Sequence, residues 1–239
     1  MNKARLDWFE NLSTAHCLAE FSLWSADLVN LQSDLDRIAA CADILHIDVA
    51  DGVFAPGFLF FPDLVASIRQ ASDLPIHVHL MVEDAVLLSQ VSQFAEAGAD
   101  IISVHAENDL AAEAIEQIAD LGLRPGIVLR VESPVELAKQ FLNQVSFVTL
   151  LGTAIGVKGQ SLSKDAPNRI HNARTMVQSE ARDQRIIVCA DGGIRENTVP
   201  QLVAAGAETV VMGSLAFGAP DLSERVRWLK GLEVRFDED

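Results

Sequence analysis

The sequence predicts an α/β protein built as a single (β/α)8 barrel, also called a TIM barrel. Short apolar runs alternate with longer amphipathic stretches from residue 21 to the end of the chain. Eight such pairs fit within this length, whereas an open doubly wound sheet usually has fewer strands. No stretch rich in Pro, Gly or Ser divides the chain, so we expect one barrel domain over residues 21–239.

The predicted strands are short and rich in Val, Ile and Leu, as strands buried on both faces require. They are residues 21–26, 44–49, 75–81, 99–106, 124–130, 145–151, 185–191 and 208–213. The stretches between them have helical spacing of apolar residues and are long enough to connect parallel strands. The predicted helices are residues 28–40, 62–71, 84–97, 109–121, 134–141, 167–180, 197–205 and 220–231.

Residues 1–20 are predicted to form a short N-terminal extension. Trp8, Phe9 and Leu12 have the spacing of an apolar stripe on a helix, which indicates a helix that covers a hydrophobic surface. A disordered tail is the alternative.

Composition and charge exclude several classes of protein. The chain has 18 Lys and Arg against 34 Asp and Glu, a net charge of −16, so nucleic acid and anionic membranes are poor partners. No apolar stretch reaches the ~20 residues of a membrane-spanning helix, and the N-terminus lacks the features of a signal peptide. Cys17, Cys41 and Cys189 are odd in number and form no CxxC pair, which favours a reducing compartment. We therefore expect a cytoplasmic protein.

Polar residues stand at the ends of three predicted strands, where barrel enzymes place their active sites. The segment HIDVADG (46–52) puts His46 and Asp48 on one face of its strand, and IHVHLM (76–81) does the same for His77 and His79. The segment CADGG (189–193) places Asp191 at the barrel mouth.

Two imidazoles and two carboxylates at one mouth are suitable ligands for a divalent transition metal. The predicted ligands are His46, Asp48, His79 and Asp191. Hydrogen-bonded core histidines and aspartates that cap turns are the alternative, but four such residues at matched strand ends favour a metal. His77 lies two residues deeper than His79 and could support a metal-ligating residue or simply pack in the core. His105 and Cys189 are expected to pack.

Glycines after the last two strands indicate a phosphate site. Gly192-Gly193 and Gly213-Ser214 offer backbone N–H groups where such barrels often bind phosphate. The Gly-rich loop 152–162 is long enough to close over a ligand, although a flexible surface loop is the alternative. Lys158 in this loop could contact the ligand or face solvent.

These motifs together resemble the ribulose-phosphate 3-epimerase family over residues 22–218. SLWSAD is similar to the family's Ser-x-x-Ser-Ala-Asp, HIDVADG to its His-x-Asp-x-Met-Asp-Gly, and HLM, DGG and GS match its later strand ends. The resemblance assigns metal ligation to His46, Asp48, His79 and Asp191. It assigns proton transfer to Asp48 and Asp191. It assigns substrate contact to Ser22, His79, Met81, Gly156, Gly159, Gly192, Gly193, Gly213 and Ser214.

The resemblance implies a barrel of the ribulose-phosphate-binding type that inverts C3 of a ketose phosphate through an enediolate. One carboxylate removes the C3 proton and the other returns a proton from the opposite face. D-ribulose 5-phosphate is the expected substrate or a near relative of it. The implied cofactor is one divalent transition metal per chain, namely zinc, iron, manganese or cobalt, and the implied assembly is a homo-oligomer.

The chain also departs from the family pattern. Ala50 and Leu151 stand where the family usually has methionine, and His77 stands where it usually has aspartate. The loop LGTAIGVKGQ (151–160) keeps only Gly156, Gly159 and Gln160 of the usual motif. These departures affect the expected sugar preference more than the expected reaction type.

Two other functions remain open. One is a phosphate-binding barrel lyase or aldolase, although the Asp-x-Lys-x-x-Asp array of such relatives is missing from the sequence. The other is a non-catalytic sugar-phosphate sensor, which would have little reason to keep four ligand residues.

Overall fold

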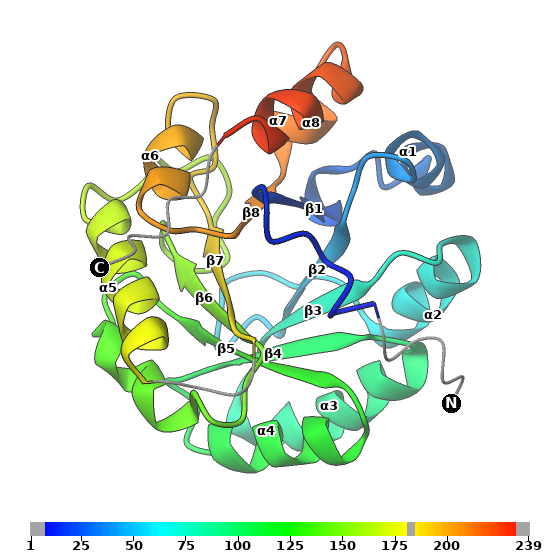
Figure 1. Cartoon of the computed structure of the whole chain (residues 1–239). Helices are drawn as coiled ribbons and strands as arrows, with labels where there is room; N and C mark the ends of the chain where they lie inside the picture. The colour runs from blue at the N-terminus through cyan, green and yellow to red at the C-terminus, as the bar shows by residue number, and fades with distance from the viewer. Residues whose placement is uncertain (1–7, 181–184, 233–239) are drawn as a thin grey trace.

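A computed structural model describes residues 8–180 and 185–232. Eight parallel strands close into a barrel in sequence order, which confirms the predicted fold class (Figure 1). The strands are β1 (Leu18–Ser22), β2 (Ile44–Ala50), β3 (Ile76–Met81), β4 (Ile101–His105), β5 (Arg124–Leu129), β6 (Phe147–Leu151), β7 (Ile187–Asp191) and β8 (Thr209–Met212).

The helices lie outside the ring of strands (Figure 1). They are α1 (Leu31–Ile38), α2 (Pro62–Ala71), α3 (Asp84–Ala97), α4 (Ala111–Asp120), α5 (Ala166–Ser179), α6 (Val199–Ala204), α7 (Ser214–Phe217) and α8 (Leu222–Lys230). Short 3₁₀ helices cover Leu23–Ser25 and Val135–Phe141, so the helix expected at 134–141 is a 3₁₀ helix. The short helix α7 was not predicted.

Alternating side chains of the strands build two separate layers. On β2, Leu45, Ile47 and Val49 belong to the large apolar core that the strands share with the surrounding helices. His46 and Asp48 lie on the opposite face of this strand, which is the inside of the barrel. The interior of the barrel mouth is therefore free to carry polar groups.

The first strand begins earlier than predicted. Strand β1 spans Leu18–Ser22, so the predicted strand 21–26 is wrong at its start by three residues, and its end falls at Ser22 rather than at residue 26. Glu20 is the physical reason, because a carboxylate at the centre of a fully buried strand argues against a strand when only the sequence is read.

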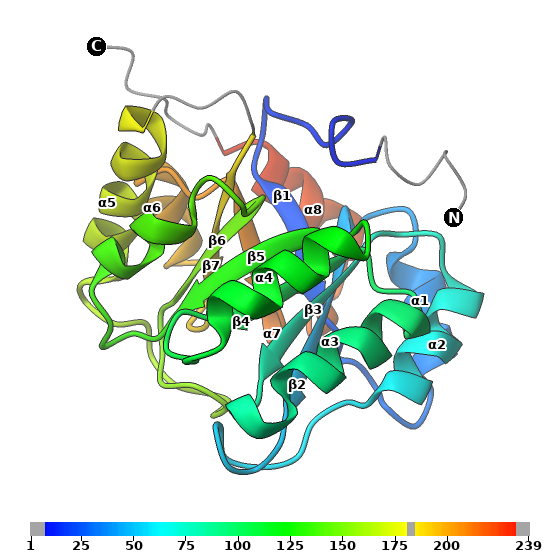
Figure 2. The ribbon, with the colours of Figure 1, turned by 90° about the horizontal axis from the view of Figure 1, so that it is seen from below.

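The residues before β1 cover one end of the barrel without forming the expected helix. Residues 8–12 form turns, and Phe9 is buried against interior side chains at the start of the strands, with Trp8 and Leu12 packed beside it. Figure 2 shows this segment at the end where the strands begin. The prediction for residues 1–7 lies outside the described residues.

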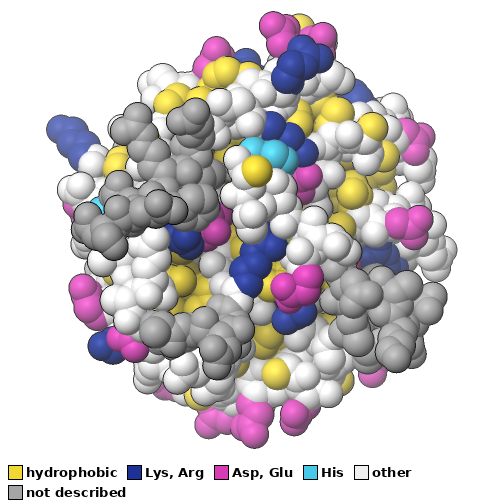
Figure 3. Space-filling view, viewed as in Figure 1, with side chains coloured by type: hydrophobic (Ala, Val, Ile, Leu, Met, Phe, Trp, Pro, Cys, Tyr) yellow, Lys and Arg dark blue, Asp and Glu magenta, His cyan; other side chains and the backbone are white. Residues whose placement is uncertain are grey.

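Charged side chains of both signs are mixed on one face of the molecule. On the face shown in Figure 3, Lys and Arg side chains are scattered among Asp and Glu side chains. Within residues 8–180 and 185–232, no helix combines the length and the apolar character that a membrane crossing demands.

Candidate active site

Four predicted site residues meet where β2, β3 and β7 end. The pairing of β2 with β3 sets Asp48 beside His79, because these residues are partners in the parallel register. His46 lies two residues before Asp48 on the same inner face, and Asp191 ends β7. The folding of three separate strands thus brings two imidazoles and two carboxyls to one place.

The distances between these side chains define a compact cluster. His46 Nε2 lies 3.2 Å from Asp48 Oδ1 and 4.0 Å from Asp191 Oδ2. His79 Nδ1 lies 3.6 Å from Asp48 Oδ1 and 3.7 Å from Asp191 Oδ2. One ligand atom from each of the four residues falls within 4.8 Å of all the others.

This cluster fits a divalent metal. His46 Nε2 and His79 Nδ1 are buried and have no hydrogen-bond partner among the described residues. A buried nitrogen is normally satisfied, so two such atoms facing the same two carboxylates suggest a common missing partner. Metal–nitrogen and metal–oxygen bonds of about 2.0–2.2 Å place neighbouring ligand atoms about 3–4 Å apart, which is the spacing found here.

The two carboxyl groups of the cluster differ in acidity. Burial would raise the pKa of Asp48, but His46 and His79 hold it well below its usual range. Burial raises the pKa of Asp191 to about 6, with His46 opposing this shift and Asp48 adding to it. Paired carboxyls with separated pKa values are typical of sites that move protons.

The surroundings of His46 shift its acidity in the opposite direction to that of Asp48. Burial would lower the pKa of His46, but Asp48 and Glu20 raise it well above its usual range.

A cavity of about 310 Å³ opens over the cluster at the barrel mouth. Asp48, His79 and Asp191 line its floor, whereas His46 is fully buried below it. Every residue expected to contact substrate lines this same cavity, namely Ser22, His79, Met81, Gly156, Gly159, Gly192, Gly193, Gly213 and Ser214.

Two of the glycine positions are tightly constrained. Gly192 and Gly193 have φ values of +85° and +70°, which side chains rarely adopt, and a Cβ at Gly193 would lie 2.7 Å from the Leu162 backbone. A Cβ at Gly213 would lie 2.6 Å from Ser25 Oγ. Bare backbone therefore forms this side of the cavity.

Ser22 supports the cluster as well as lining the cavity. Its hydroxyl donates a 2.8 Å hydrogen bond to Asp48 Oδ2, at the end of β1. The other oxygen of Asp48 is thereby left to face His46 and His79.

A hydrogen-bonded chain of side chains holds His79 from behind. His79 Nε2 lies 2.8 Å from His105 Nε2, and His105 Nδ1 lies 3.1 Å from Glu107 Oε2. Burial lowers the pKa of His105 to about 4, so this ring stays neutral and its Nε2 can accept a hydrogen bond from His79 Nε2–H. His105 was expected only to pack, and its contact with a ligand residue is a finding of the structure.

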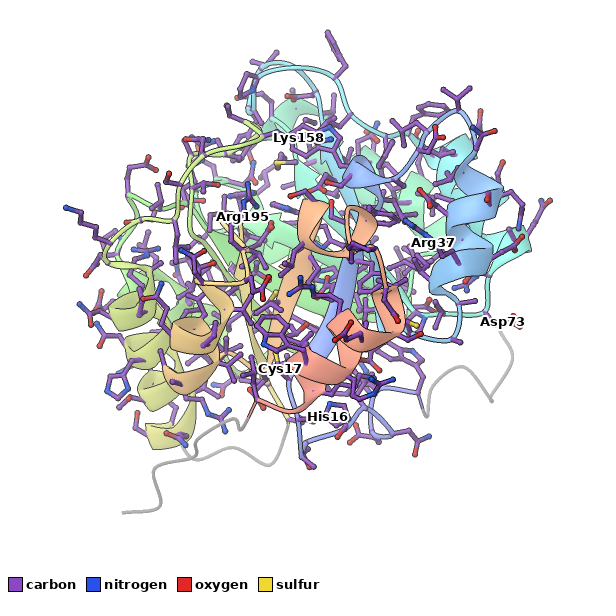
Figure 4. All side chains as sticks on the ribbon, turned by 90° about the horizontal axis from the view of Figure 1, so that it is seen from above. His16, Cys17, Arg37, Asp73, Lys158 and Arg195 are labelled. Carbon is purple, nitrogen blue, oxygen red and sulfur yellow. The ribbon has the colours of Figure 1, made fainter. Side chains whose placement is uncertain are left out.

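The loop between β6 and α5 closes over one side of the cavity. Lys158 donates a hydrogen bond to the Trp24 carbonyl, and its ammonium lies 4.6 Å from the centre of the Trp24 ring. Figure 4 shows Lys158 and Arg195 at the end of the barrel opposite His16 and Cys17. Both cations line the cavity.

Sequence reasoning missed Glu20 and assigned only packing to His105. Glu20 is wholly buried in β1 and hydrogen-bonds His46 and His77. A signal existed for His105, because it shares a strand face with Ser103, two residues earlier. For Glu20 the sequence offered only a charge among apolar residues.

The chain is similar in sequence to known proteins over most of its length. The model of the family described as ribulose-phosphate 3 epimerase matches residues 18–217. A ribulose-phosphate 3-epimerase of Bacillus subtilis is 32% identical over 212 residues, which cover 88% of this chain and 96% of that protein. Another from Aquifex aeolicus is 35% identical over 195 residues, 80% of this chain and 85% of that protein.

One solved structure shows how widely the fold is shared. A 3-hexulose-6-phosphate synthase from Salmonella typhimurium has a TM-score of 0.67 and 15% identity, with 90% of this chain and 97% of that chain covered. At this identity the likeness shows the barrel fold alone. The match of the family model and the identity to its members decide the assignment: this chain belongs to the ribulose-phosphate 3-epimerase family.

Proposed function

We propose that this protein is a metal-dependent epimerase that inverts C3 of a ketose phosphate. D-ribulose 5-phosphate, converted to D-xylulose 5-phosphate, is the first substrate to test. The observation that carries the proposal is the pair Asp48 and Asp191, which line one cavity and lie within 4.0 Å of two buried imidazole nitrogens. Neither nitrogen has a hydrogen-bond partner among the described residues.

The two carboxyl groups would move the protons. One carboxylate removes the C3 proton, and the bonding electrons of C3–H pass into an enediolate across C2 and C3. The other carboxyl then returns a proton to C3 from the opposite face, which inverts this carbon. The reaction leaves the first carboxyl protonated and the second ionised, so the reverse reaction uses the same pair in exchanged roles.

His46, Asp48, His79 and Asp191 would hold the metal. A divalent cation in this place supplies positive charge beside substrate oxygens that become negative when C3 loses its proton. Zinc, iron, manganese and cobalt all suit a mixed imidazole and carboxylate ligand set.

Backbone amides would hold the phosphate. Gly192, Gly193, Gly213 and Ser214 line the cavity together, and N–H groups without side chains can approach an anion closely. Arg195 and Lys158 line the same cavity and would add positive charge, in a chain whose net charge is −16. These local groups outweigh the distant acidic surface, because salt screens exposed charges beyond about 8 Å.

Of the two residues that replace the family's usual methionines, only Leu151 lines the cavity. Ala50 packs with Ala55 and with Met81, which does line it. A change of this size shifts discrimination by about 1–3 kcal/mol, so a related ketose phosphate remains a candidate for the preferred substrate.

We also propose that the protein forms a homo-oligomer in a reducing compartment such as the cytoplasm. Val53, Phe58 and Phe61 are exposed near the β2–α2 connection, and burial of such side chains is a common reason for self-association. Its three cysteines are free. Light scattering after size-exclusion chromatography tests the assembly, and a monomer would refute it.

Epimerisation and metal content together test the proposal. The purified protein is expected to carry about one transition metal per chain and to convert ribulose 5-phosphate to its C3 epimer. Chelation should abolish turnover and re-addition of metal should restore it. A protein that binds sugar phosphates with full metal occupancy but never turns them over would be the sensor, and carbon–carbon cleavage would identify a lyase or aldolase.

A further inference from the structure

Glu20 is a buried carboxylate that the proton transfers do not use. It lies in β1, and its Oε1 is 2.7 Å from His46 Nδ1 and 2.6 Å from His77 Nδ1. Its Oε2 receives weaker contacts from Thr209 Oγ1 at 3.4 Å and Cys189 Sγ at 3.8 Å. A charge in a barrel core requires such partners, because an unpaired buried carboxylate is strongly unfavourable.

One oxygen of Glu20 serves both imidazoles. Glu20 Oε1 lies within hydrogen-bond distance of His46 Nδ1 and of His77 Nδ1. A carboxylate oxygen accepts hydrogen bonds, so both imidazoles donate to it through Nδ1–H. For His46 this means that the proton on Nδ1 is fixed, whatever the charge of the ring.

Fixing the Nδ1 proton leaves only His46 Nε2 as a possible metal ligand. That atom is buried, faces Asp48 and Asp191, and has no hydrogen-bond partner among the described residues. Glu20 thus holds the His46 ring at Nδ1, while Nε2 on the other side of the ring points into the metal cluster. It does not line the cavity, so it touches neither substrate nor the proton path.

His77 extends this support across the barrel. Ser103 Oγ lies 2.6 Å from His77 Nε2, so the hydroxyl donates to His77 and His77 donates to Glu20. One negative charge is therefore shared by two imidazoles, of which only His46 belongs to the metal cluster.

We propose that Glu20 is a positioning residue that orients His46 and strengthens metal binding at its Nε2. A carboxylate that accepts a hydrogen bond from the far nitrogen of a ligand histidine fixes its tautomer and raises its basicity. The inference rests on the proposed metal site. In this chain the supporting carboxylate comes from β1, and an imidazole stands at position 77 where the family usually has aspartate.

The matched variants are Glu20→Gln and Thr209→Val. Glutamine keeps the size and one acceptor but removes the charge, whereas valine removes only the hydroxyl that contacts the other oxygen of Glu20. Dissociation constants for Co²⁺ are measured by chelator competition. Glu20→Gln should weaken Co²⁺ binding by about 10–100-fold, and Thr209→Val should change it by less than about threefold. Turnover of Glu20→Gln should recover at saturating metal.

Equal Co²⁺ affinity of Glu20→Gln and wild type would overturn the inference. So would a second ion per chain that Glu20→Gln alone loses, because Glu20 would then be a ligand itself. If wild type binds no metal at all, the proposed metal site fails rather than the role of Glu20 within it.

A measurement on the wild-type protein covers the case in which Glu20→Gln does not fold. In the zinc-loaded, ¹⁵N-labelled protein, His46 should show a protonated Nδ1 and a metal-bound Nε2. Metal bound to Nδ1 of His46 would overturn the inference.

Discussion

Asp48 and Asp191 show how burial gives two identical functional groups different acidities. Asp48 receives a hydrogen bond from Ser22 and faces two imidazoles, so it stays ionised. Asp191 lacks such a donor in this cluster, and burial raises its pKa to about 6. A pair that differs in this way can hold one proton between its members, as inversion at a single carbon requires.

Asp191→Asn should leave the barrel folded and reduce kcat by about 10²–10⁴-fold, because it removes one proton-transfer group. Steady-state kinetics of C3 epimerisation check this, with metal content measured in parallel because Asp191 is also a proposed ligand. Asp165→Asn, an exposed change at the start of α5, is the control. A near-normal rate in Asp191→Asn would mean that another group moves the proton.

Glu107 makes a prediction about stability and pH. Burial would raise its pKa, but hydrogen bonds from His105, Ser133 and the Arg130 backbone lower it from 4.5 to about 2. A lowered folded-state pKa stabilises the protein fully above the unfolded value, and this stabilisation is lost as pH falls from about 4.5 toward 2.

As pH falls through this window, the free energy of unfolding of Glu107→Gln should therefore decrease less than that of wild type. Urea denaturation at several pH values measures the slope. Glu113→Gln, which changes an acidic residue in the first turn of α4, should keep the wild-type slope. Parallel curves for Glu107→Gln and wild type would contradict the lowered pKa.

For single residues, the sequence predicted which polar side chains share one face of a strand. His46 with Asp48 and His77 with His79 follow the two-residue period, so their common face is readable without a structure. Glu20 is different, because its partners lie 26 and 57 residues away along the chain. The pairing of β1 with β2 and of β2 with β3 brings these groups together.

The loop between β6 and α5 is the element most open to test. Lys158 ties this loop to the segment after β1 through the Trp24 carbonyl and ring. One hydrogen bond and one cation–π contact contribute about 1–2 kcal/mol together.

Lys158→Met should raise KM for the ketose phosphate by up to about tenfold, since the loop closes less often over the cavity. Lys164→Met carries the same change of charge near the end of this loop and outside the cavity lining, so it should keep the wild-type KM. Equal effects of the two variants would show that only net charge matters.

The turn between β8 and α7 carries a second test at this scale. Valine at Gly213 would collide with Ser25 Oγ and crowd the proposed phosphate site. Hydrogen bonds to a charged group contribute about 1.5–3 kcal/mol, so Gly213→Val should raise KM for ribulose 5-phosphate about tenfold or more. The KM for unphosphorylated ribulose, which is expected to be high, should not change. A parallel rise for both sugars would place the phosphate elsewhere.

Element boundaries were predictable where local chemistry marks them. Helix α2 begins at Pro62, and α3 ends just before Gly98, which adopts a left-handed conformation. The ranges of both helices agree with the prediction. The start of β1 was wrong by three residues, because Glu20 stabilises its place through tertiary partners alone. The segment Val135–Phe141 follows helical spacing but folds as a 3₁₀ helix.

The whole molecule combines a closed core with an open polar mouth. Phe9 and its neighbours fill the end where the strands begin, and the cavity opens at the end where the strands finish. This division lets a chain with a net charge of −16 keep the proposed phosphate site apart from its acidic surface. The number of βα units predicted this architecture, whereas the depth and lining of the cavity depend on loops whose course the sequence does not specify.

Proton exchange at C3 tests the central claim most directly. The metal-loaded protein is incubated with D-ribulose 5-phosphate in heavy water, and proton NMR follows the C3 signal and the appearance of the epimer. We predict that deuterium enters at C3 as D-xylulose 5-phosphate forms, and that chelation stops both processes. If the metal-loaded protein produces neither C3 exchange nor epimer from this or any other ketose phosphate, the account of the site is contradicted.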